Sequence, residues 1–308
     1  MPSKPSIQVN QLCLNYGHFE AVKNINFNLK CGEIIGFLGV NGAGKSTTIK
    51  MLTGNLAPTQ GDVIISGFSL SDDSIRAKNC LGYLPENPPL YNAMRVDDYL
   101  LFCAKIHHVK KQQLKESLDN VKQRCGITSV GQKIIGQLSK GYQQRIGIAQ
   151  AIIHQPAFII LDEPTVALDP VQIIEVRQLI KKLSQHHGVI FSTHILSEVT
   201  ELCDRVIVID HGKIIYQDSI DELKTRLQTS SLSLAFTTPP NIDTLLKIAP
   251  ITQATQIDNQ HFKVDFDKTI NPAELIVEQS VINHWGLYEL IPQQQKLEDL
   301  FLNMVSRS

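Results

Sequence analysis

Several features are missing from this sequence, and each absence narrows the class of protein. No apolar run approaches the roughly 20 residues that are needed to cross a bilayer, so we expect no membrane-spanning segment. The start of the chain leads into no apolar stretch of the signal-peptide kind. The 29 basic and 30 acidic residues nearly cancel, so the overall charge does not favour a nucleic-acid partner. We therefore expect a soluble, cytoplasmic protein that reaches a membrane only through a partner.

The cysteine and histidine patterns of structural metal centres are also missing. The six cysteines are scattered without a Cys-x-x-Cys pair, so we expect free thiols in packing roles. For two adjacent pairs, His107-His108 and His186-His187, no set of Cys or carboxylate residues completes a metal site. Side chains at neighbouring helical positions diverge by about 100°, so two adjacent histidines do not point at one metal ion. We therefore expect both pairs on the solvated surface.

Apolar residues are plentiful, and the chain is long enough for two domains. They make up 43% of the 308 residues, which is enough for a sizeable core. The composition changes near Gln228, and the polar stretch 229–231 is typical of a linker, so we predict domains at 1–228 and 229–308. The second domain has the β-α-β-β-α-β order of a small ferredoxin-like α+β module, followed by a helix. Its predicted elements are 232–237, 242–248, 252–257, 262–266, 272–284, 287–291 and the helix 296–305.

One stretch carries the strongest chemical signal, because it fits the phosphate-loop pattern G-x-x-x-x-G-K-[ST]. An apolar segment at 34–38 predicts a buried strand before it, and 47–53 predicts a helix after it. Glycines let backbone N–H groups turn inward, and the start of a helix favours an anion. We therefore predict that the stretch binds the polyphosphate of a nucleotide, with Lys45 reaching the β- and γ-phosphates and Ser46 ligating Mg²⁺. Its residues are Gly39, Val40, Asn41, Gly42, Ala43, Gly44, Lys45, Ser46 and Thr47.

Polar residues follow two buried apolar runs further along the chain. The run 158–161 ends at Asp162-Glu163, and the run 189–191 ends just before His194. Open α/β sheets place their ligands at the carboxyl ends of the strands. We expect Asp162 to accept hydrogen bonds from waters on Mg²⁺, Glu163 to reach the water that attacks the γ-phosphate, and His194 to contact that phosphate. A structural carboxylate and a satisfied core histidine are the weaker readings in a chain with a phosphate loop.

The remaining segments complete the predicted fold class. Residues 7–29 alternate in polarity around a turn, which indicates antiparallel strands. Tyr16 in that turn either covers the sheet edge or stacks on a base. Residues 86–150 indicate a mostly helical insert that begins with a stiff proline-rich loop, and Ser139 is the predicted N-cap of its last helix. We predict an α/β fold: a three-layer P-loop NTPase core with an antiparallel β-subdomain and a helical insert.

Taken in order, these motifs resemble the ATP-binding subunits of ABC transporters over about residues 7–225. The segment 138–145 is similar to the ABC signature, 158–163 to the Walker B strand, and 167–169 to the D-loop. The resemblance implies ATP and Mg²⁺ as ligands and ATP hydrolysis as the reaction. It implies Lys45, Glu163 and His194 as catalytic residues, Tyr16 as the aromatic that stacks on adenine, and Ser46 and Glu86 as Mg²⁺ ligands with Asp162 acting through water.

The sequence departs from the usual family pattern at several positions. Glu86 stands where Gln is usual, so an oxygen ligand remains but an NH₂ donor is lost. Lys140 and Tyr142 replace a Gly and the Gln of the L-S-G-G-Q signature, and Val166 stands where Ser is common. The stretch 83–91 together with Leu-Ser-Lys-Gly-Tyr is similar to a narrower group, the drug-resistance, sodium-efflux and gliding-motility exporter ATPases of bacteria. Residues 297–301 resemble the terminal helix of that group.

The resemblance also implies partners. Two such subunits, identical or paralogous, dimerise head to tail, and Ser139, Gly141 and Asp169 then act across the interface. A separate transmembrane permease contacts residues 86–105, which places the chain on the cytoplasmic face of the inner membrane. The alternative is a soluble ABC ATPase without a permease, but the sequence has no tandem halves, long coiled coil or basic arm. A P-loop kinase or GTPase is a third reading, and the Asn-Lys-x-Asp guanine motif is absent.

Overall fold

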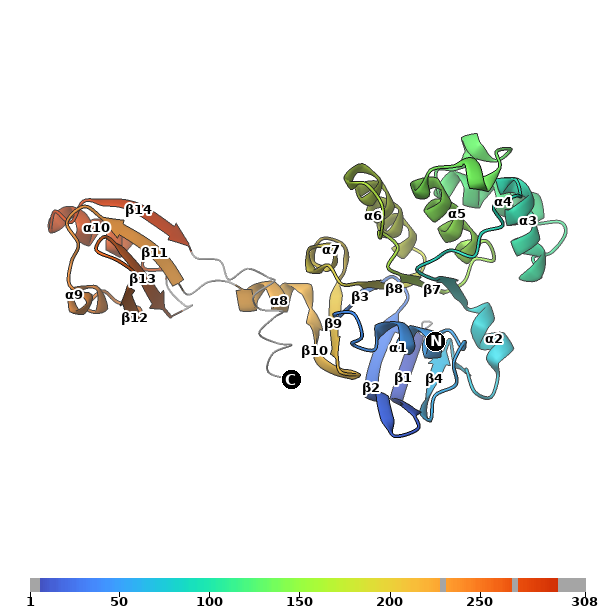
Figure 1. Cartoon of the computed structure of the whole chain (residues 1–308), viewed down its shortest axis with the longest axis horizontal. Coiled ribbons are helices and arrows are strands. Elements are labelled where there is room, and N and C mark those ends of the chain that lie inside the picture. Colours follow the sequence, from blue (N-terminus) through green and yellow to red (C-terminus); the bar gives the residue numbers. More distant parts are fainter. Residues whose placement is uncertain (1–5, 228–230, 268–270, 293–308) are drawn as a thin grey trace, which may run out of the picture. The chain divides into compact units, whose positions relative to one another are not determined.

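The computed structural model describes residues 6–227, 231–267 and 271–292, and the chain divides into two compact units (Figure 1). The first unit extends to Ile220, and the second begins at Asp221. Helix α8 (Ile220–Leu227) lies between this division and the domain boundary expected after residue 228. The position of the domain boundary therefore stays a prediction, which a truncation can test.

The centre of the first unit is a six-stranded sheet, and its inner strands β3, β7 and β8 are fully buried, as expected for strands covered on both faces. The strands lie in the order β10-β9-β3-β8-β7-β6, and all neighbours are parallel except β9 and β10. In this register Asp162 pairs with Ser192, and Leu38 pairs with Thr193. The phosphate loop, the Asp-Glu pair and His194 therefore leave the sheet at one edge. The bounds are β3 Ile34–Leu38, β6 Leu81–Leu84, β7 Phe158–Asp162, β8 Gly188–Thr193, β9 Arg205–Asp210 and β10 Lys213–Ser219.

A second, antiparallel sheet packs against one face of the first and confirms the predicted β-subdomain. Its strand order is β2-β1-β4-β5, and α1 (Lys45–Leu52) lies between the two sheets. Alternate residues of β1 and β2 point into this core, where Ile25 and Leu29 join Phe37 and Ile49. The alternation of apolar and polar residues in the sequence thus places the apolar side chains on one buried face of the sheet. The bounds are β1 Ser6–Tyr16, β2 Phe19–Lys30, β4 Gln60–Ile65 and β5 Phe68–Ser69.

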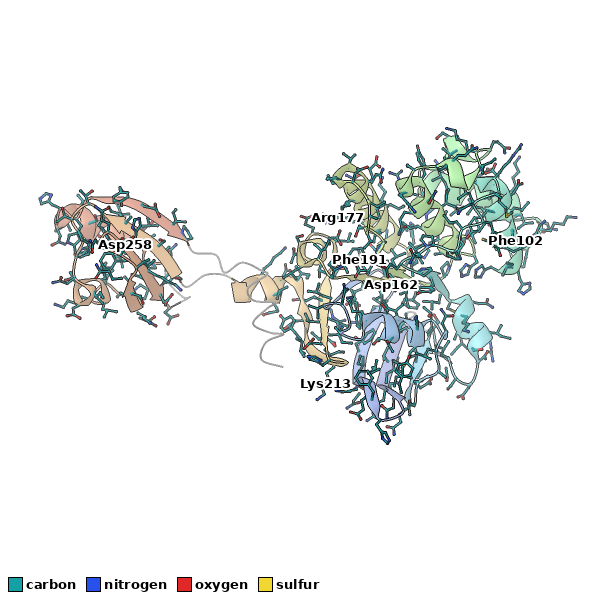
Figure 2. The ribbon with its side chains drawn as sticks, viewed as in Figure 1. Phe102, Asp162, Arg177, Phe191, Lys213 and Asp258 are labelled. Atoms are coloured by element: carbon teal, nitrogen blue, oxygen red, sulfur yellow. The ribbon has the colours of Figure 1, made fainter. Side chains whose placement is uncertain are left out.

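Helices cover the other face of the central sheet, and two glycines let them approach closely. A Cβ on Gly36 of β3 would lie 2.5 Å from Cγ1 of Val199 on α7 (Leu196–Leu202). A Cβ on Gly82 of β6 would lie 2.1 Å from the carbonyl oxygen of Ala151 on α5 (Lys140–Ile152). The backbone of α5 therefore rests directly on β6. Helix α6 (Pro170–Ser184) covers β8, whose Phe191 lies in the interior near Asp162 (Figure 2).

The insert is mostly helical, as predicted, and its attachment to the core involves a histidine that was expected on the surface. Arg124, at the end of α4, donates to Nε2 of His187 at 2.9 Å, and Nδ1 of His187 donates to the Pro156 carbonyl at 2.6 Å. His187 is only 3% exposed, and burial lowers its pKa. The expectation of a solvated surface was wrong for His187, because its ring fills a gap between two polar partners. The helices of the insert are α3 Val96–Ile106, α4 Leu114–Arg124 and α5, with 3₁₀ turns at Thr128–Val130 and Ile135–Gln137, and the short helix α2 (Ser74–Asn79) precedes the insert.

The second unit has the element order that the sequence predicts. Its four antiparallel strands lie in the order β12-β13-β11-β14, and two helices cover them. Phe236 and Phe262 meet Trp285 and Ile276 in a separate core. The predicted helix 296–305 lies outside the described residues. None of the described helices is long and apolar enough to cross a bilayer. The bounds are β11 Ser231–Phe236, α9 Ile242–Leu246, β12 Ile251–Gln256, β13 His261–Phe266, α10 Ala273–Ile282 and β14 Leu287–Pro292.

Candidate nucleotide-binding site

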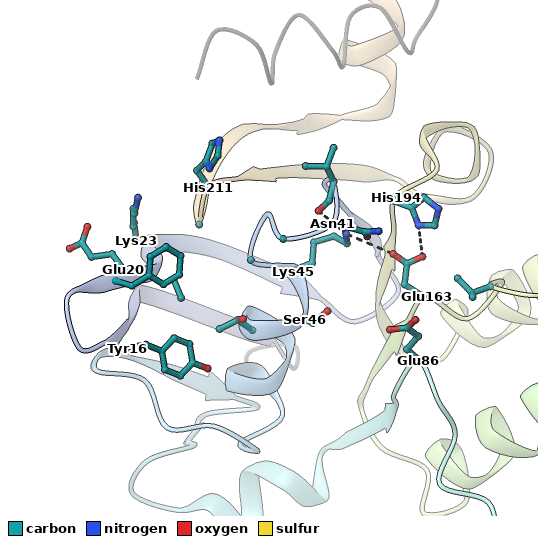
Figure 3. Close-up of a pocket in the computed structure, with 18 residues that line it drawn as sticks. Tyr16, Glu20, Lys23, Asn41, Lys45, Ser46, Glu86, Glu163, His194 and His211 are labelled. Carbon is teal, nitrogen blue, oxygen red and sulfur yellow. Dashed lines mark hydrogen bonds and ion pairs between the residues drawn. The ribbon is translucent and has the colours of Figure 1, made fainter.

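The phosphate loop and the carboxyl ends of β7 and β8 border one cavity of about 410 Å³, a size that suits a small ligand (Figure 3). Loop residues Val40, Asn41, Gly42, Gly44, Lys45, Ser46 and Thr47 line it, together with Tyr16, Glu86, Glu163 and His194. Gly39, Ala43 and Asp162 belong to the same segments but do not border the cavity. The structure therefore brings together most of the residues that the sequence singled out.

The phosphate loop is shaped by glycine conformations and by close backbone neighbours. Gly42 has φ 83° and Gly44 has φ 107°, in the left-handed region that favours glycine. A Cβ on Gly44 would approach the Cα of Gly212 at 3.3 Å, so a larger residue does not fit easily. No side chain caps the start of α1 at Lys45, which leaves its first N–H groups available for an anion. The loop therefore fits a phosphate group.

Lys45 is held inside this loop. It is 5% exposed, and its Nζ donates to the Gly39 carbonyl at 2.7 Å and to the Val40 carbonyl at 3.3 Å. Burial lowers the pKa of Lys45, whereas the nearby carboxylates, led by Glu163, raise it. The ammonium group is thus a preplaced point charge at the base of the cavity.

Glu163 follows β7 and faces both Lys45 and His194. Its Oε1 lies 3.8 Å from Nζ of Lys45, and its Oε2 accepts a 3.0 Å hydrogen bond from Nδ1 of His194. Its backbone has φ 48°, an unfavourable conformation for a residue with a side chain. A hydrogen bond from its N–H to the Ser192 carbonyl, at 3.1 Å, helps to hold this conformation. Burial raises the pKa of Glu163, and the hydrogen bond from His194 opposes that shift.

The oxygen donors for a cation come from three different elements. Ser46 at the start of α1 and Glu86 after β6 both border the cavity. Asp162 lies behind them, 5% exposed, and its Oδ1 accepts from Oγ of Ser192 at 2.7 Å. Burial raises the pKa of Asp162, and the Ser192 hydrogen bond opposes this. Among the described residues no three His, Cys, Asp or Glu side chains form a ready-made metal cluster. A cation that takes few protein ligands and completes its shell with phosphate and water fits this set.

The opposite end of the cavity contains residues that sequence reasoning missed. Tyr16 borders it and is 56% exposed, and Phe19, on the facing strand, is 69% exposed. Glu20, Lys23 and His211 also line it (Figure 3). The turn that contains His211 reaches the loop because the N–H of Gly212 donates to the Ala43 carbonyl at 2.9 Å. The approach of this turn to the phosphate loop is a contact between distant segments, which no local sequence pattern indicates.

Ser139, Gly141 and Asp169 form a separate group that does not border the cavity. Ser139 caps α5 by accepting from the N–H of Tyr142 at 3.5 Å, which confirms the predicted N-cap. Asp169 caps α6 by accepting from the N–H of Gln172 at 2.9 Å. A Cβ on Gly141 would lie 2.7 Å from that Gln172 side chain, so the two helix starts are neighbours.

A phosphate loop before a helix, with an Asp-Glu pair and a histidine on adjacent strand ends, defines a P-loop nucleotide-binding ATPase. The ABC transporter family model matches residues 22–166. The ABC transporter ATP-binding protein YxlF of Bacillus subtilis is 32% identical over 299 residues, which cover 97% of this chain and 99% of YxlF. The chain belongs to the ABC transporter ATP-binding proteins, and it is an ATPase of that type.

Further relatives and solved structures agree with this assignment. The bacitracin transport ATP-binding protein BcrA of Bacillus licheniformis is 39% identical over 222 residues, an alignment that covers 71% of this chain and 72% of BcrA. The linearmycin resistance ATP-binding protein LnrL of Bacillus subtilis is 30% identical over 307 residues, an alignment that covers 98% of this chain and 99% of LnrL. The structure of cbiO1 from Clostridium perfringens, described as part of the ABC transporter complex cbiONQ, has a TM-score of 0.65 at 30% identity and covers 71% of this chain and 90% of its own.

Proposed function

We propose that this chain is the ATP-hydrolysing subunit of a bacterial exporter and powers transport through a separate membrane permease. One observation carries the proposal: Lys45, Glu163 and His194 meet in one cavity, whereas Ser139, Gly141 and Asp169 lie outside it. A single copy then supplies one half of an ATP site, and a second subunit supplies the other half. The names of BcrA and LnrL, which refer to bacitracin transport and linearmycin resistance, support export as the purpose.

Within this proposal each catalytic side chain has a distinct task. Lys45 neutralises charge on the β- and γ-phosphates. Glu163 accepts the proton of the attacking water, and His194 orients the Glu163 carboxylate through the 3.0 Å hydrogen bond and contacts the γ-phosphate. Tyr16 stacks on adenine at the other end of the cavity. These tasks require positioning and charge stabilisation, which is what phosphoryl transfer needs.

Mg²⁺ is the cation that the donor set fits. Ser46 and Glu86 would hold it directly, and Asp162 would act through a bound water. When bound, the ion supplies charge stabilisation to the phosphate oxygens. Glu86 adds a negative charge where the family usually has a neutral amide, so we expect it to bind the cation at least as firmly as Gln does, but to offer no NH₂ donor to a neighbouring oxygen.

A mixing experiment tests the two-subunit site. Lys45→Ala destroys the phosphate-loop half, and Ser139→Glu places a negative charge where the partner's γ-phosphate would lie. Neither variant should hydrolyse ATP alone. An equal mixture should recover about a quarter of the parent activity, because about half of the dimers are mixed and each contains one intact site of two. A mixture as inactive as its components would show that Ser139 does not complete a site on a second subunit.

The surface beside the proline-rich loop is the proposed permease contact. Tyr91 is 53% exposed, Phe102 39% and Ile106 55%, and the rings of Tyr91 and Phe102 are 5.6 Å apart. A group of exposed apolar side chains on one surface is typical of a protein contact. We propose that this contact holds the chain at the cytoplasmic face of the inner membrane. Tyr91→Ser with Phe102→Ser should release the protein from membranes while its ATP binding persists. A parent protein that never co-purifies with membranes would favour the soluble ABC ATPase.

A further inference from the structure

One fully buried carboxylate has no role in the chemistry described so far. Glu198 lies in α7, four residues after His194, and its side chain is 0% exposed. An isolated charge without solvent is costly, so a buried carboxylate has to be satisfied by hydrogen bonds or by an opposite charge. The partners of Glu198 therefore indicate what its position in the fold depends on.

Three side chains from different elements converge on this carboxylate. Oε2 of Glu198 accepts from Oγ1 of Thr193 at 2.8 Å and from Oγ1 of Thr165 at 3.0 Å. Its Oε1 accepts from Nη2 of Arg177 at 3.2 Å. Thr165 is 4% exposed and Thr193 is 0% exposed, so water does not compete for these hydrogen bonds. The carboxylate thus joins the end of β8 to the turn after β7 and to α6.

The two threonines flank the proposed catalytic pair. Thr193 directly precedes His194, and its Oγ1 also accepts from the N–H of Ile195 at 3.0 Å, so the backbone is held on both sides of the histidine. Thr165 lies two residues after Glu163, whose left-handed backbone needs support from its surroundings. Glu198 therefore fixes the His194 turn and the Glu163 turn to the same point, although it touches neither residue's side chain.

The third partner extends this connection to a second functional segment. Arg177 lies on α6, facing α7, and also pairs with Glu201 of that helix (Figure 2). Helix α6 is capped at its start by Asp169, which is the residue proposed to face the second subunit. The Arg177–Glu198 ion pair thus connects that helix with both catalytic turns.

We infer that Glu198 is a positioning residue for ATP hydrolysis. Its carboxylate sets the distance between Glu163 and His194 and connects both turns to α6. The inference rests on the proposed roles of Glu163 and His194. Misplacement of catalytic groups by about 1 Å can cost around 100-fold in rate, so loss of the Glu198 connection should lower kcat. ATP binding should persist, because the phosphate loop and Tyr16 make no contact with Glu198.

Glu198→Gln is the direct test, because an amide cannot satisfy all three partners. With its oxygen toward the threonines, its NH₂ group faces the Arg177 guanidinium, and two donors oppose each other. In the other orientation the threonine hydroxyls lose their acceptor. We expect kcat for ATP to fall about 10- to 100-fold, with the affinity for a fluorescent ATP analogue within about threefold of the parent. Glu201→Gln is the matched control, since Glu201 pairs with the same Arg177 but contacts neither threonine, and it should keep kcat within about twofold.

A second pair of variants keeps the test valid if Glu198→Gln folds poorly. Thr193→Val removes the hydroxyl with little change in shape and should lower kcat, whereas Thr193→Ser keeps the hydroxyl and should restore most of the rate. Adding Thr193→Val to Glu198→Gln should cost little more, because both changes break the same connection. Unchanged kcat in a folded Glu198→Gln or Thr193→Val protein would overturn the inference. So would losses of kcat and of nucleotide binding in equal proportion, because a merely structural residue would behave in that way.

Glu163→Gln, measured in parallel, separates this inference from the proposed function. If Glu163→Gln is inactive and Glu198→Gln is not, the positioning role is wrong and the catalytic assignment stands. If Glu163→Gln still turns over, the catalytic assignment itself is wrong.

Discussion

Replacing Glu163 by Gln changes the charge of the proposed general base with almost no change in shape. The structure predicts a selective effect. The amide oxygen can still accept from Nδ1 of His194, and Lys45 keeps its hydrogen bonds to the Gly39 and Val40 carbonyls. ATP affinity should therefore be unchanged or higher, because one negative charge beside the phosphate site is gone. Turnover loses the proton acceptor, a contribution of about 10²- to 10⁴-fold, or roughly 3 to 5.5 kcal/mol in the activation barrier.

Two measurements on the full chain separate these effects. Phosphate release at saturating ATP and Mg²⁺ reports turnover, and a fluorescent ATP analogue reports binding. Size-exclusion chromatography with ATP should show the variant trapped as a dimer, because ATP that is not hydrolysed cannot release the closed state. Turnover within tenfold of the parent would refute the role of Glu163. Loss of binding together with turnover would show that Glu163 instead supports the phosphate loop.

Four further predictions concern the cation site, the pH dependence, the packing of α5 and the domain boundary. Glu86→Gln introduces the amide that is usual in the family and should leave turnover within about threefold at saturating Mg²⁺, in contrast to Glu163→Gln. Burial raises the pKa of Glu163, so phosphate release should decline with falling pH around a midpoint above the ordinary value of 4.5, since the protonated acid accepts no proton; the residual activity of Glu163→Gln should lack this decline. Gly82→Ala should destabilise the first unit by about 1 to 3 kcal/mol, seen as a lower Tm, because its Cβ would lie 2.1 Å from the carbonyl oxygen of Ala151 on α5; an unchanged Tm would contradict this close approach. A fragment of residues 1–228 should fold and bind ATP, and an insoluble fragment would place the domain boundary elsewhere.

The sequence predicted those parts of the site that depend on local patterns. The phosphate loop, the strand before it and the helix after it form one continuous signal, and Glu163 and His194 each end an apolar run. Because parallel strands end at one edge, their meeting followed from the fold class. The helix α6 was not predicted, although Asp169 as N-cap, Pro170 at the first position and the apolar spacing behind them give a local signal.

The remaining features depend on contacts between distant segments. Thr165, Thr193 and Glu198 are ordinary residues in the sequence, and only the pairing of β7 with β8 and the packing of α7 bring them together. His187 was expected in solvent because no Cys or carboxylate set completes a metal site around it, yet Arg124 reaches it from another subdomain. Neither arrangement produces periodicity or a motif, so sequence patterns do not reveal it.

The close approach at Gly82 has a consequence for how force passes through this protein. A Cβ on Gly147 of α5 would likewise lie 2.6 Å from Cδ1 of Leu84 and 3.1 Å from Cβ of Pro88, so side chains of β6 and of the proline-rich loop rest directly on the α5 backbone. Well-packed interiors have low compressibility and transmit strain, so contacts as close as these leave little room to absorb a displacement. A push on the loop that follows β6 is therefore delivered as movement of the helix that begins after Ser139. The permease would act on α5 through the loop that contacts Gly147, and the second subunit would act at the start of the same stiff helix.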